Sequence, residues 1–325
     1  MRWLALFALT GCQFVHGALT SARSDAAGEA DADASIDAVD APPDTTGPNC
    51  YARWMSGNIA FSTPVLLSSL NSSGFDRDPF FEMNELTGYV SSARTGSTGG
   101  DIWRATRSSL SGAFSTPALA SEFNSVGNET KLSISENQRI AVVGSDRTGG
   151  EGGIDVWMST RASATNPWPA MTQTGLSSVN SSIEEHDPTL STDGLHLYLA
   201  PHDGSDQDLA MASRTSTSQA FGSPARLTTL NSTSGDADPS PTPDELIIVF
   251  SSGRTLLGAA NGNIWYSTRA TKTAAWAFAT AVPSPVINTD AAEGDPHLST
   301  DGCRLYFGRD SAANDNWEIY VATMQ

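Results

Sequence analysis

Positive charge is scarce in this chain. Among its 325 residues there are 18 lysines and arginines against 36 aspartates and glutamates, which gives a net charge of −18, and only Lys131 and Lys272 are lysines. The bases form no cluster. This argues against nucleic acid as a ligand, because binding to phosphate backbones requires a basic surface. Direct adhesion to anionic lipid is disfavoured for the same reason.

Helical patterning is scarce as well. After Cys50 no stretch sustains apolar residues spaced three and four apart, so almost no helix is expected there. The chain also has no Gly-x-Ser-x-Gly elbow, phosphate-binding loop or dinucleotide fingerprint. No cofactor is therefore expected, and no metal-binding motif is assigned.

What the chain does contain is one motif written five times. Residues 187–199 read DPTLSTDGLHLYL and residues 295–307 read DPHLSTDGCRLYF. Residues 238–250 (DPSPTPDELIIVF) and 78–90 (DPFFEMNELTGYV) follow the same pattern, and 129–143 (ETKLSISENQRIAVV) is a more divergent copy with one residue more before its apolar run. A period of roughly 50 to 58 residues is typical of a repeat architecture.

The spacing of apolar residues in each repeat is typical of short strands. Asp193-Gly194 and Asp301-Gly302 precede apolar runs and suit tight hairpin turns, because glycine accepts positive φ. A third strand carries a run such as Asp-Ile-Trp, and a fourth follows it and usually runs out into asparagine. In four repeats the third strand ends on an arginine: Arg107, Arg161, Arg214 and Arg269. Four short strands per unit, separated by Gly, Pro, Ser and Asn, predict the blade of a β-propeller.

The two ends of the repeat array are offset. Residues 61–71 (FSTPVLLSSLN) look like a fourth strand before the first complete unit, whereas the last unit stops at Gln325 after its third strand. We therefore expect the N-terminal strand to complete the last blade, which would leave no half-built blade with free pairing groups. The prediction is an all-β, five-bladed β-propeller of four-stranded antiparallel blades over residues 50–325. Six blades is the alternative.

The N-terminal segment predicts export. Residues 1–12 combine one arginine, a short apolar run and the sequence LTGC, which resembles the lipobox of bacterial lipoproteins, in which the cysteine (here Cys12) is acylated. A chance Gly-Cys, or a true start further upstream, is the other reading.

Residues 13–49 are rich in Ala, Asp and Pro, with seven acids and no base in 24–49. Too few large apolar groups are present to offset the entropy of ordering, so this segment is expected to be a disordered tether. A calcium-binding acidic run is the alternative.

Three cysteines are present, and acylation would use Cys12. Cys50 precedes the strand expected to complete the last blade, and Cys303 lies within that blade. In an oxidising, exported setting these two would form a disulfide that secures the ring closure.

The combined motif resembles a known family. D-P-x-L-S-x-D-G-x-x-L-Y-F followed by D-I-W-x-x-T-R, together with residues 145–161 (SDRTGGEGGIDVWMSTR), is similar to the WD-repeat-like propeller repeats of TolB type. The likeness covers residues 50–325, with departures such as Thr130 for Pro, Glu136-Asn137 for Asp-Gly, and Ala210 for Trp. TolB has six blades and a separate N-terminal domain, so a Tol–Pal role does not carry over. The resemblance implies an envelope propeller that acts as a binding platform.

Five acids recur at the start of the first strand of each unit. Because that strand lines the channel of a propeller, they could form a carboxylate ring that binds a cation. Alternatively they cap turns or accept backbone N–H bonds, since a need repeated in every blade suggests a structural cause. The five are Asp78, Glu129, Asp187, Asp238 and Asp295.

Few other side chains qualify as catalytic candidates. Glu184, Glu185 and Glu293 depart from the repeat but are expected in connectors rather than innermost strands. The tryptophans at 103, 157 and 265 are expected to pack between blades. The histidines show no short metal-ligand spacing, although His186 and His297 fall near first strands.

These observations predict a monomeric, lipid-anchored propeller of the bacterial cell envelope. Its place would be the outer membrane, facing the periplasm or the cell surface. It would bind an envelope protein or polysaccharide through the connectors at residues 95–100, 148–153, 201–206 and 256–262, and it would catalyse nothing. The alternatives are a glycoside hydrolase acting in the channel, which needs two singular carboxylates, and a lectin with sites between blades.

Overall fold

The computed structural model describes residues 49–97, 99–256, 262–310 and 316–325. The expected leader, Cys12 and nearly all of the expected tether lie outside these ranges. Within the part of the chain that is described, no helix has the length and apolar character required to cross a membrane.

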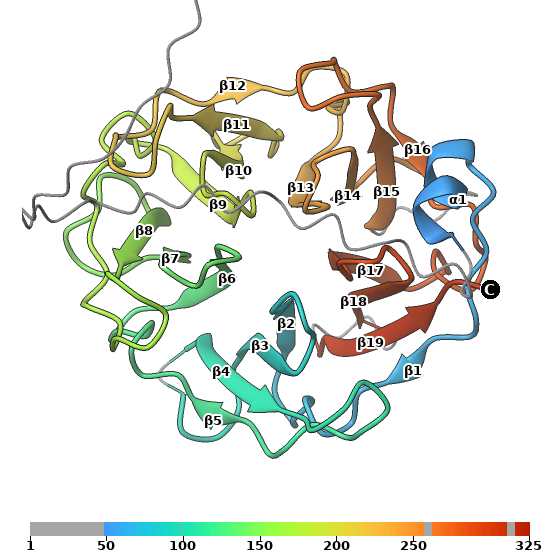
Figure 1. The fold of residues 1–325 in the computed structure, drawn as a ribbon, viewed down its shortest axis with the longest axis horizontal. Helices are drawn as coiled ribbons and strands as arrows, with labels where there is room; N and C mark the ends of the chain where they lie inside the picture. The colour runs from blue at the N-terminus through green and yellow to red at the C-terminus, as the bar shows by residue number, and fades with distance from the viewer. Residues whose placement is uncertain (1–48, 98, 257–261, 311–315) are drawn as a thin grey trace, which may run out of the picture. The chain divides into compact units, whose positions relative to one another are not determined.

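Five antiparallel sheets stand around a central channel as the blades of a β-propeller (Figure 1). Four sheets have four strands, and the second has three, with a single bridge between Met158 and Thr172 at its outer edge. The predicted five-bladed architecture is confirmed. Blade 1 consists of β2 (Asp76–Phe81), β3 (Thr87–Ser92), β4 (Asp101–Thr106) and β5 (Ala118–Leu119), and blade 2 of β6 (Glu129–Ile134), β7 (Ile140–Ser145) and β8 (Asp155–Thr160). Blade 3 consists of β9 (Glu184–Leu190), β10 (His196–His202), β11 (Ala210–Ser213) and β12 (Ala225–Arg226). Blade 4 consists of β13 (Asp236–Pro241), β14 (Ile247–Ser252), β15 (Asn263–Thr268) and β16 (Thr280–Ala281). Blade 5 consists of β17 (Ala292–Leu298), β18 (Arg304–Asp310), β19 (Glu318–Thr323) and the N-terminal β1 (Val65–Leu66).

The hairpin between the first two strands of a blade follows from its residues. In blades 3 and 5, Gly194 and Gly302 have φ of 69°, in the left-handed region that glycine enters without steric cost. Asp193 Oδ1 accepts the backbone N–H of Leu195 and the hydroxyl of Ser191. The Asp-Gly pairs are therefore part of the blade scaffold.

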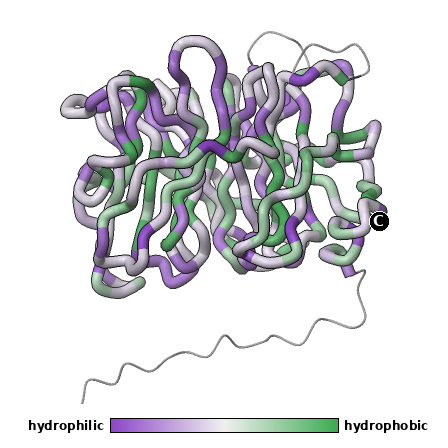
Figure 2. The backbone as a smooth tube through the Cα atoms, turned by 90° about the horizontal axis from the view of Figure 1, so that it is seen from above, coloured by the Kyte–Doolittle hydropathy of each residue, from purple (hydrophilic) through white to green (hydrophobic). Residues whose placement is uncertain are grey.

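Hydrophobic cores lie between adjacent blades. Leu197 and Leu199 of β10 pack with Val142 of β7, whereas Tyr198, on the other face of the same strand, packs with Ile248 of β14. Successive side chains of a strand point to opposite faces, so each face of a blade meets a different neighbour. In the side view, hydrophobic residues lie mainly within the blades and hydrophilic residues in the connectors at both faces (Figure 2).

The ring is closed by the N-terminal strand, as the offset of the repeat array predicts. β1 pairs antiparallel with β19, with Val65 opposite Val321. Further along, Ser62 N–H donates to the carbonyl of Thr323 at 2.8 Å. The outer strand of blade 5 therefore comes from the opposite end of the array.

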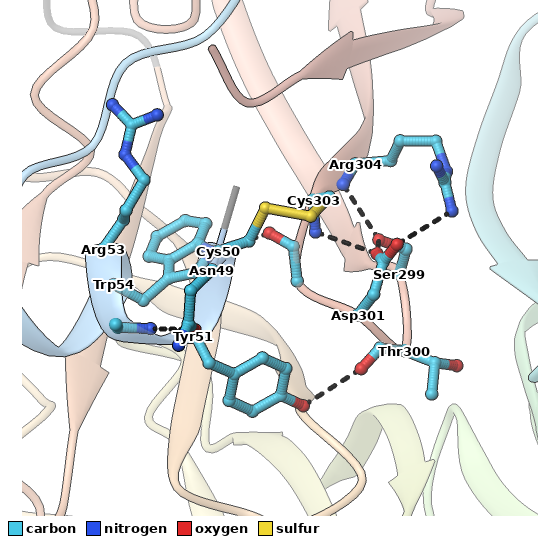
Figure 3. The surroundings of a disulfide bond; sticks show 12 residues. Asn49, Cys50, Tyr51, Arg53, Trp54, Ser299, Thr300, Asp301, Cys303 and Arg304 are labelled. Atoms are coloured by element: carbon cyan, nitrogen blue, oxygen red, sulfur yellow. Dashed lines mark hydrogen bonds and ion pairs between the residues drawn. A yellow bond between two sulfur atoms is a disulfide. The ribbon is translucent and has the colours of Figure 1, made fainter. Parts of the chain in front are cut away.

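A disulfide secures this closure. Cys50 and Cys303 are bonded, with their Cα atoms 5.2 Å apart and a separation of 253 in the sequence, which confirms the predicted pair (Figure 3). Cys50 begins α1 (Cys50–Ser56), a helix of 7 residues whose first turn is capped by the Asn49 side chain. Trp54 of α1 is buried and its indole N–H donates to the carbonyl of Gly302 at 2.9 Å. The helix and the disulfide together fasten residues 50–66 to blade 5.

Candidate functional site

Four aspartates of the repeat meet at the centre of the channel. Asp78, Asp187, Asp238 and Asp295 have φ between 51° and 55°, and each sits at a bulge where its innermost strand holds one residue more than its partner. Aspartate tolerates the left-handed region better than most residues, and the proline that follows has no N–H to lose from the ladder. The oxygens of Asp78, Asp238 and Asp295 lie within 4.8 Å of one another. Four of the five predicted ring acids are thus brought together.

Glu129 does not belong to this ring. It pairs with Ser145 in the register in which Asp76 pairs with Ser92, so it occupies the position of Asp76 rather than that of Asp78. The extra residue of the bulge in β6 is Lys131. The prediction that Glu129 belongs to the ring was wrong, because the first acid of this divergent copy aligns with Asp76 and not with Asp78. Asn137 occupies the same position in its hairpin as Asp193, and counting six residues back from each aligns Lys131 with Asp187.

The ring therefore consists of four carboxylates and one ammonium group, and we call it the channel ring. Lys131 is 4% exposed, and its Nζ has no hydrogen-bond partner among the described residues. Burial lowers the pKa of Lys131, but the nearby carboxylates, with Asp238 foremost, outweigh burial and raise it. Lys131 thus supplies a tethered cation where a ring of acids alone would require one from solution.

The four carboxylates are not equivalent. Burial raises the pKa of Asp187 and Asp295 well above the usual range, and the charges of Asp238 and Asp78 raise it further. Burial also acts on Asp238, but Lys131, the Ser251 hydroxyl and the Asp295 backbone N–H together lower its pKa. Asp238 is therefore the ionised partner of Lys131. Asp187 and Asp295 keep protons at a pH at which a free aspartate has lost them.

Neighbouring blades are tied together through the channel ring. The Asp238 N–H donates to Asp187 Oδ2 at 3.3 Å, and the Asp295 N–H donates to Asp238 Oδ2 at 3.2 Å. Each of these bonds joins the carboxylate of one blade to the backbone of the next. This agrees with the structural alternative for the repeated acids.

Chambers open on both sides of the channel ring. The connector-side chamber, about 610 Å³, has the ring aspartates at its floor and Gly100, Gln207 and Gly262 in its wall. The hairpin-side chamber, about 340 Å³, is lined by residues of the first hairpins, such as Asn84 and Thr192, and by His297. Burial, together with the charge of Lys131, lowers the pKa of His297 to about 3, so this histidine is neutral at physiological pH.

A second set of acids has a structural function outside the ring. Each accepts the backbone N–H of the residue four positions earlier, as Glu129 does from Ser125 and Glu185 does from Ser181. Glu185 and Glu293, with Glu184, were expected in connectors, but they lie within the innermost strands β9 and β17. Glu185 and Glu293 also recur in the repeat rather than depart from it. The full set is Asp76, Glu129, Glu185, Asp236 and Glu293.

Four of these acids form ion pairs with arginines that also stack on aromatic rings. Arg147, for example, lies 3.0 Å from Glu129 and 5.3 Å from the centre of the Trp157 ring. This explains the S-x-R…D-I-W sequence and places the repeated tryptophans in the scaffold, as expected. The pairs are Arg94–Asp76, Arg147–Glu129, Arg254–Asp236 and Arg309–Glu293.

Blade 3 departs from this arrangement. Asp203 stands at the position that holds the arginine in blades 1, 2 and 4, and Ala210 replaces the tryptophan. Glu185 is 1% exposed and forms no ion pair with the described residues. Burial consequently raises the pKa of Glu185 to about 7, although the hydroxyl and N–H of Ser181 oppose the shift.

This difference predicts opposite effects of the same substitution in two blades. The pKa of Glu185 is about 7 in the folded protein, against 4.5 for an unperturbed glutamate, so its protonation stabilises the fold fully below pH 4.5 and no longer does so above pH 7. Glu185→Gln should remove this loss, which amounts to at most about 3 kcal/mol. Urea unfolding at several pH values would measure the difference between variant and wild type, which should grow in favour of the variant as pH rises.

Glu129→Gln is the matched control. It breaks the ion pair with Arg147, and removing one partner of a buried pair costs about 3–5 kcal/mol. This variant should therefore be destabilised at neutral pH. Equal responses of the two variants would contradict the assignment of a protonated Glu185.

Blade 3 also holds a cluster that the sequence did not indicate. The side chains of Glu184, His186 and His202 bring one carboxylate oxygen and two imidazole nitrogens within 4.8 Å of one another. Hydrogen bonds from the two histidines, His186 first, lower the pKa of Glu184. The spacing along the chain hides the cluster, because His202 reaches it only through the register of a hairpin.

Comparison with known proteins shows the fold but no family. No family model matches the chain, and no curated protein matches it in sequence. An α-L-arabinofuranosidase from Podospora anserina, solved with cellotriose, is 11% identical over 82% of this chain and 96% of its own, with a TM-score of 0.52. A family 117 glycoside hydrolase from Zobellia galactanivorans is 13% identical over 82% and 90%, with a TM-score of 0.51.

TolB from Acinetobacter baumannii is also among the similar structures. It is 12% identical over 78% of this chain and 56% of its own, with a TM-score of 0.44. The five sheets of the structure define the class of this protein as a five-bladed β-propeller. Its structural neighbours include glycoside hydrolases and TolB-type propellers, and a likeness at these identities concerns the fold alone.

Proposed function

We propose that this protein is a lipid-anchored propeller of the bacterial envelope that binds an envelope protein or polysaccharide in its connector-side chamber and is not an enzyme. The observation that carries the proposal is the composition of the channel ring. Its aspartates recur from blade to blade, two of them (Asp187 and Asp238) accept backbone N–H groups of the next blade, and Lys131 offsets the charge of Asp238.

This composition disfavours the glycoside hydrolase alternative. Hydrolysis of a glycosidic bond requires an acid and a base or nucleophile of different character, placed on either side of the bond. Asp187 and Asp238 do differ in pKa, but both occupy one repeated structural position and both accept hydrogen bonds from the backbone of the next blade. A group engaged in holding adjacent blades together is poorly suited to exchange protons with a substrate.

The rim of the same chamber supports binding. The connectors predicted to form the platform join the second and third strands of their blades, and Gly100 and Gly262 at their ends line the connector-side chamber. They differ in length and content from blade to blade. Loops on a rigid scaffold can vary without disturbing the blades, so specific recognition is expected there. The Cys12 anchor and the tether would hold this platform away from the membrane as a monomer.

Site-specific photo-crosslinking tests the proposal. A benzophenone amino acid at Gln207 would sit in the connector-side chamber, and the same group at Glu136 in the hairpin-side chamber is the matched control. In intact cells the variant at position 207 should form one discrete adduct that fractionates with the envelope. Sensitivity of that adduct to protease or to periodate would separate a protein ligand from a polysaccharide.

Two results would overturn the proposal. Equal adducts at positions 207 and 136 would show that the connector-side chamber is not the binding site. Release of reducing sugar from a polysaccharide by the wild-type protein, lost in Asp238→Asn, would instead establish the hydrolase.

A further inference from the structure

We propose that Glu184, His186 and His202 form a binding site for Zn²⁺ on the third blade. The site does not depend on the function proposed above. It is built from blade 3, which lacks both the arginine and the tryptophan of the repeat, and it lies beside the connector-side chamber, of which His186 forms part of the wall.

The strand geometry places the three side chains together. Glu184 and His186 are two residues apart on β9, so they point to the same face of the blade. His202 is the direct cross-strand partner of Glu184 in the pairing of β10 with β9. Side chains in such a pair have their Cβ atoms about 5 Å apart. The three groups therefore converge without any distortion of the backbone.

The distances suit a small divalent metal. His186 Nε2 lies 2.9 Å and His202 Nδ1 lies 3.3 Å from the same oxygen, Oε2 of Glu184. Around a tetrahedral Zn²⁺ with bonds of about 2.0–2.1 Å, neighbouring ligand atoms are about 3.3 Å apart. The two imidazole nitrogens lie within 4.8 Å of each other, so binding would require them to approach by at most about 1.5 Å. All three side chains are partly exposed, with 39%, 19% and 36% exposure in sequence order, so a metal can reach them from solvent.

None of the other blades has this ligand set. The register aligns the pair Glu184 and His202 with Phe75 and Ala93, Asn128 and Asp146, Gly235 and Gly253, and Ala292 and Asp310. His186 likewise corresponds to Arg77, Thr130, Ala237 and Gly294. The same blade has also replaced the repeat's arginine with Asp203. An arginine there would place a positive charge near the metal, so its replacement removes an electrostatic obstacle to binding.

The donor types select the metal. Two imidazoles and one carboxylate favour zinc and neighbouring first-row metals, whereas Ca²⁺ and Mg²⁺ prefer oxygen ligands alone. Three protein ligands leave one position of a tetrahedral ion open to water or to a group of a bound molecule.

Titration with Zn²⁺ in competition with a chromophoric chelator tests the site. The full chain, purified without a polyhistidine tag and dialysed against EDTA, should bind one Zn²⁺ with micromolar or tighter affinity in a manner that requires His186 and His202. His186→Ala and His202→Ala should each weaken this binding at least about 100-fold, since losses of 10–100-fold already follow from changes behind the ligands. Co²⁺ in place of Zn²⁺ should give the visible absorption of a tetrahedral site in the wild type only.

His196→Ala is the matched control. His196 lies on β10 of the same blade but bonds to Glu245, so its variant should keep the wild-type affinity for Zn²⁺. Thermal unfolding without metal would verify that the His186 and His202 variants are folded. Zn²⁺ binding that is unchanged in the double variant, or a wild type that binds Ca²⁺ in preference to Zn²⁺, would overturn the proposal and leave the cluster as an ion-pair network.

Discussion

Lys131→Met is expected to lower the free energy of unfolding at pH 7 by about 3–5 kcal/mol, the usual cost of leaving a buried charge without its partner. Methionine has a similar length but no charge, so the packing volume is largely kept. The variant leaves Asp238 ionised among three other carboxylates in a buried channel. Urea unfolding at pH 7 would measure the loss.

The same variant should recover stability as pH falls. Lys131 lowers the pKa of Asp238 in the wild type, and without it Asp238 takes up a proton at higher pH. Protonation removes the uncompensated charge, so the deficit relative to wild type should shrink toward pH 4. Adding Asp238→Asn to Lys131→Met should also restore part of the stability at pH 7, which a double-mutant cycle would quantify.

Lys272, the only other lysine, provides the control. It also pairs with acids, Asp193 and Glu245, but its side chain is 42% exposed. Lys272→Met should therefore cost less than about 1 kcal/mol. A similar cost for both lysines would show that the channel ring does not depend on the charge of Lys131.

Replacing Cys50 and Cys303 with serine is expected to lower the free energy of unfolding by about 5 kcal/mol in the loop-entropy model, because the bond closes an exceptionally long loop. The stabilisation comes from restricting the unfolded chain, and it adds to the pairing of β1 with β19. Guanidinium unfolding of the variant would measure it. Hydrogen exchange should show β1 opening before the rest of blade 5.

Reduced wild-type protein serves as the internal check on the serine variant. Both lack the bond, so their unfolding midpoints should agree, and both should fall below that of the oxidised protein. A serine variant as stable as the oxidised wild type would mean that the antiparallel pairing of β1 with β19 closes the ring unaided.

Much of the architecture can be predicted from the amino-acid sequence because each blade repeats the same short sequence motifs. The Asp-Gly hairpins, the D-I-W strands and the offset between residues 61–71 and Gln325 are local or countable features, and they predicted five blades and a shared last blade. The cysteine pair followed from the same offset. Each depends on the residues of one or two neighbouring strands.

The candidate sites were harder to predict because they depend on register. Glu129 and Lys131 differ by two positions, and the choice between them decides whether the channel ring holds five acids or four acids and a cation. The arginine missing beside Glu185 can be recognised only once the strand register assigns Asp203 to its position. His202 joins Glu184 only across a hairpin, at a separation of 18 residues.

The repeat alone was therefore sufficient to specify a propeller, the closure of its ring and the scaffold roles of its glycines and tryptophans, since periodic patterns encode local geometry. The channel ring, the raised pKa of Glu185 and the histidine cluster of blade 3 emerged only from the folded chain. These properties depend on burial and on contacts between blades, and a cyclic arrangement brings together side chains that no spacing along the chain connects.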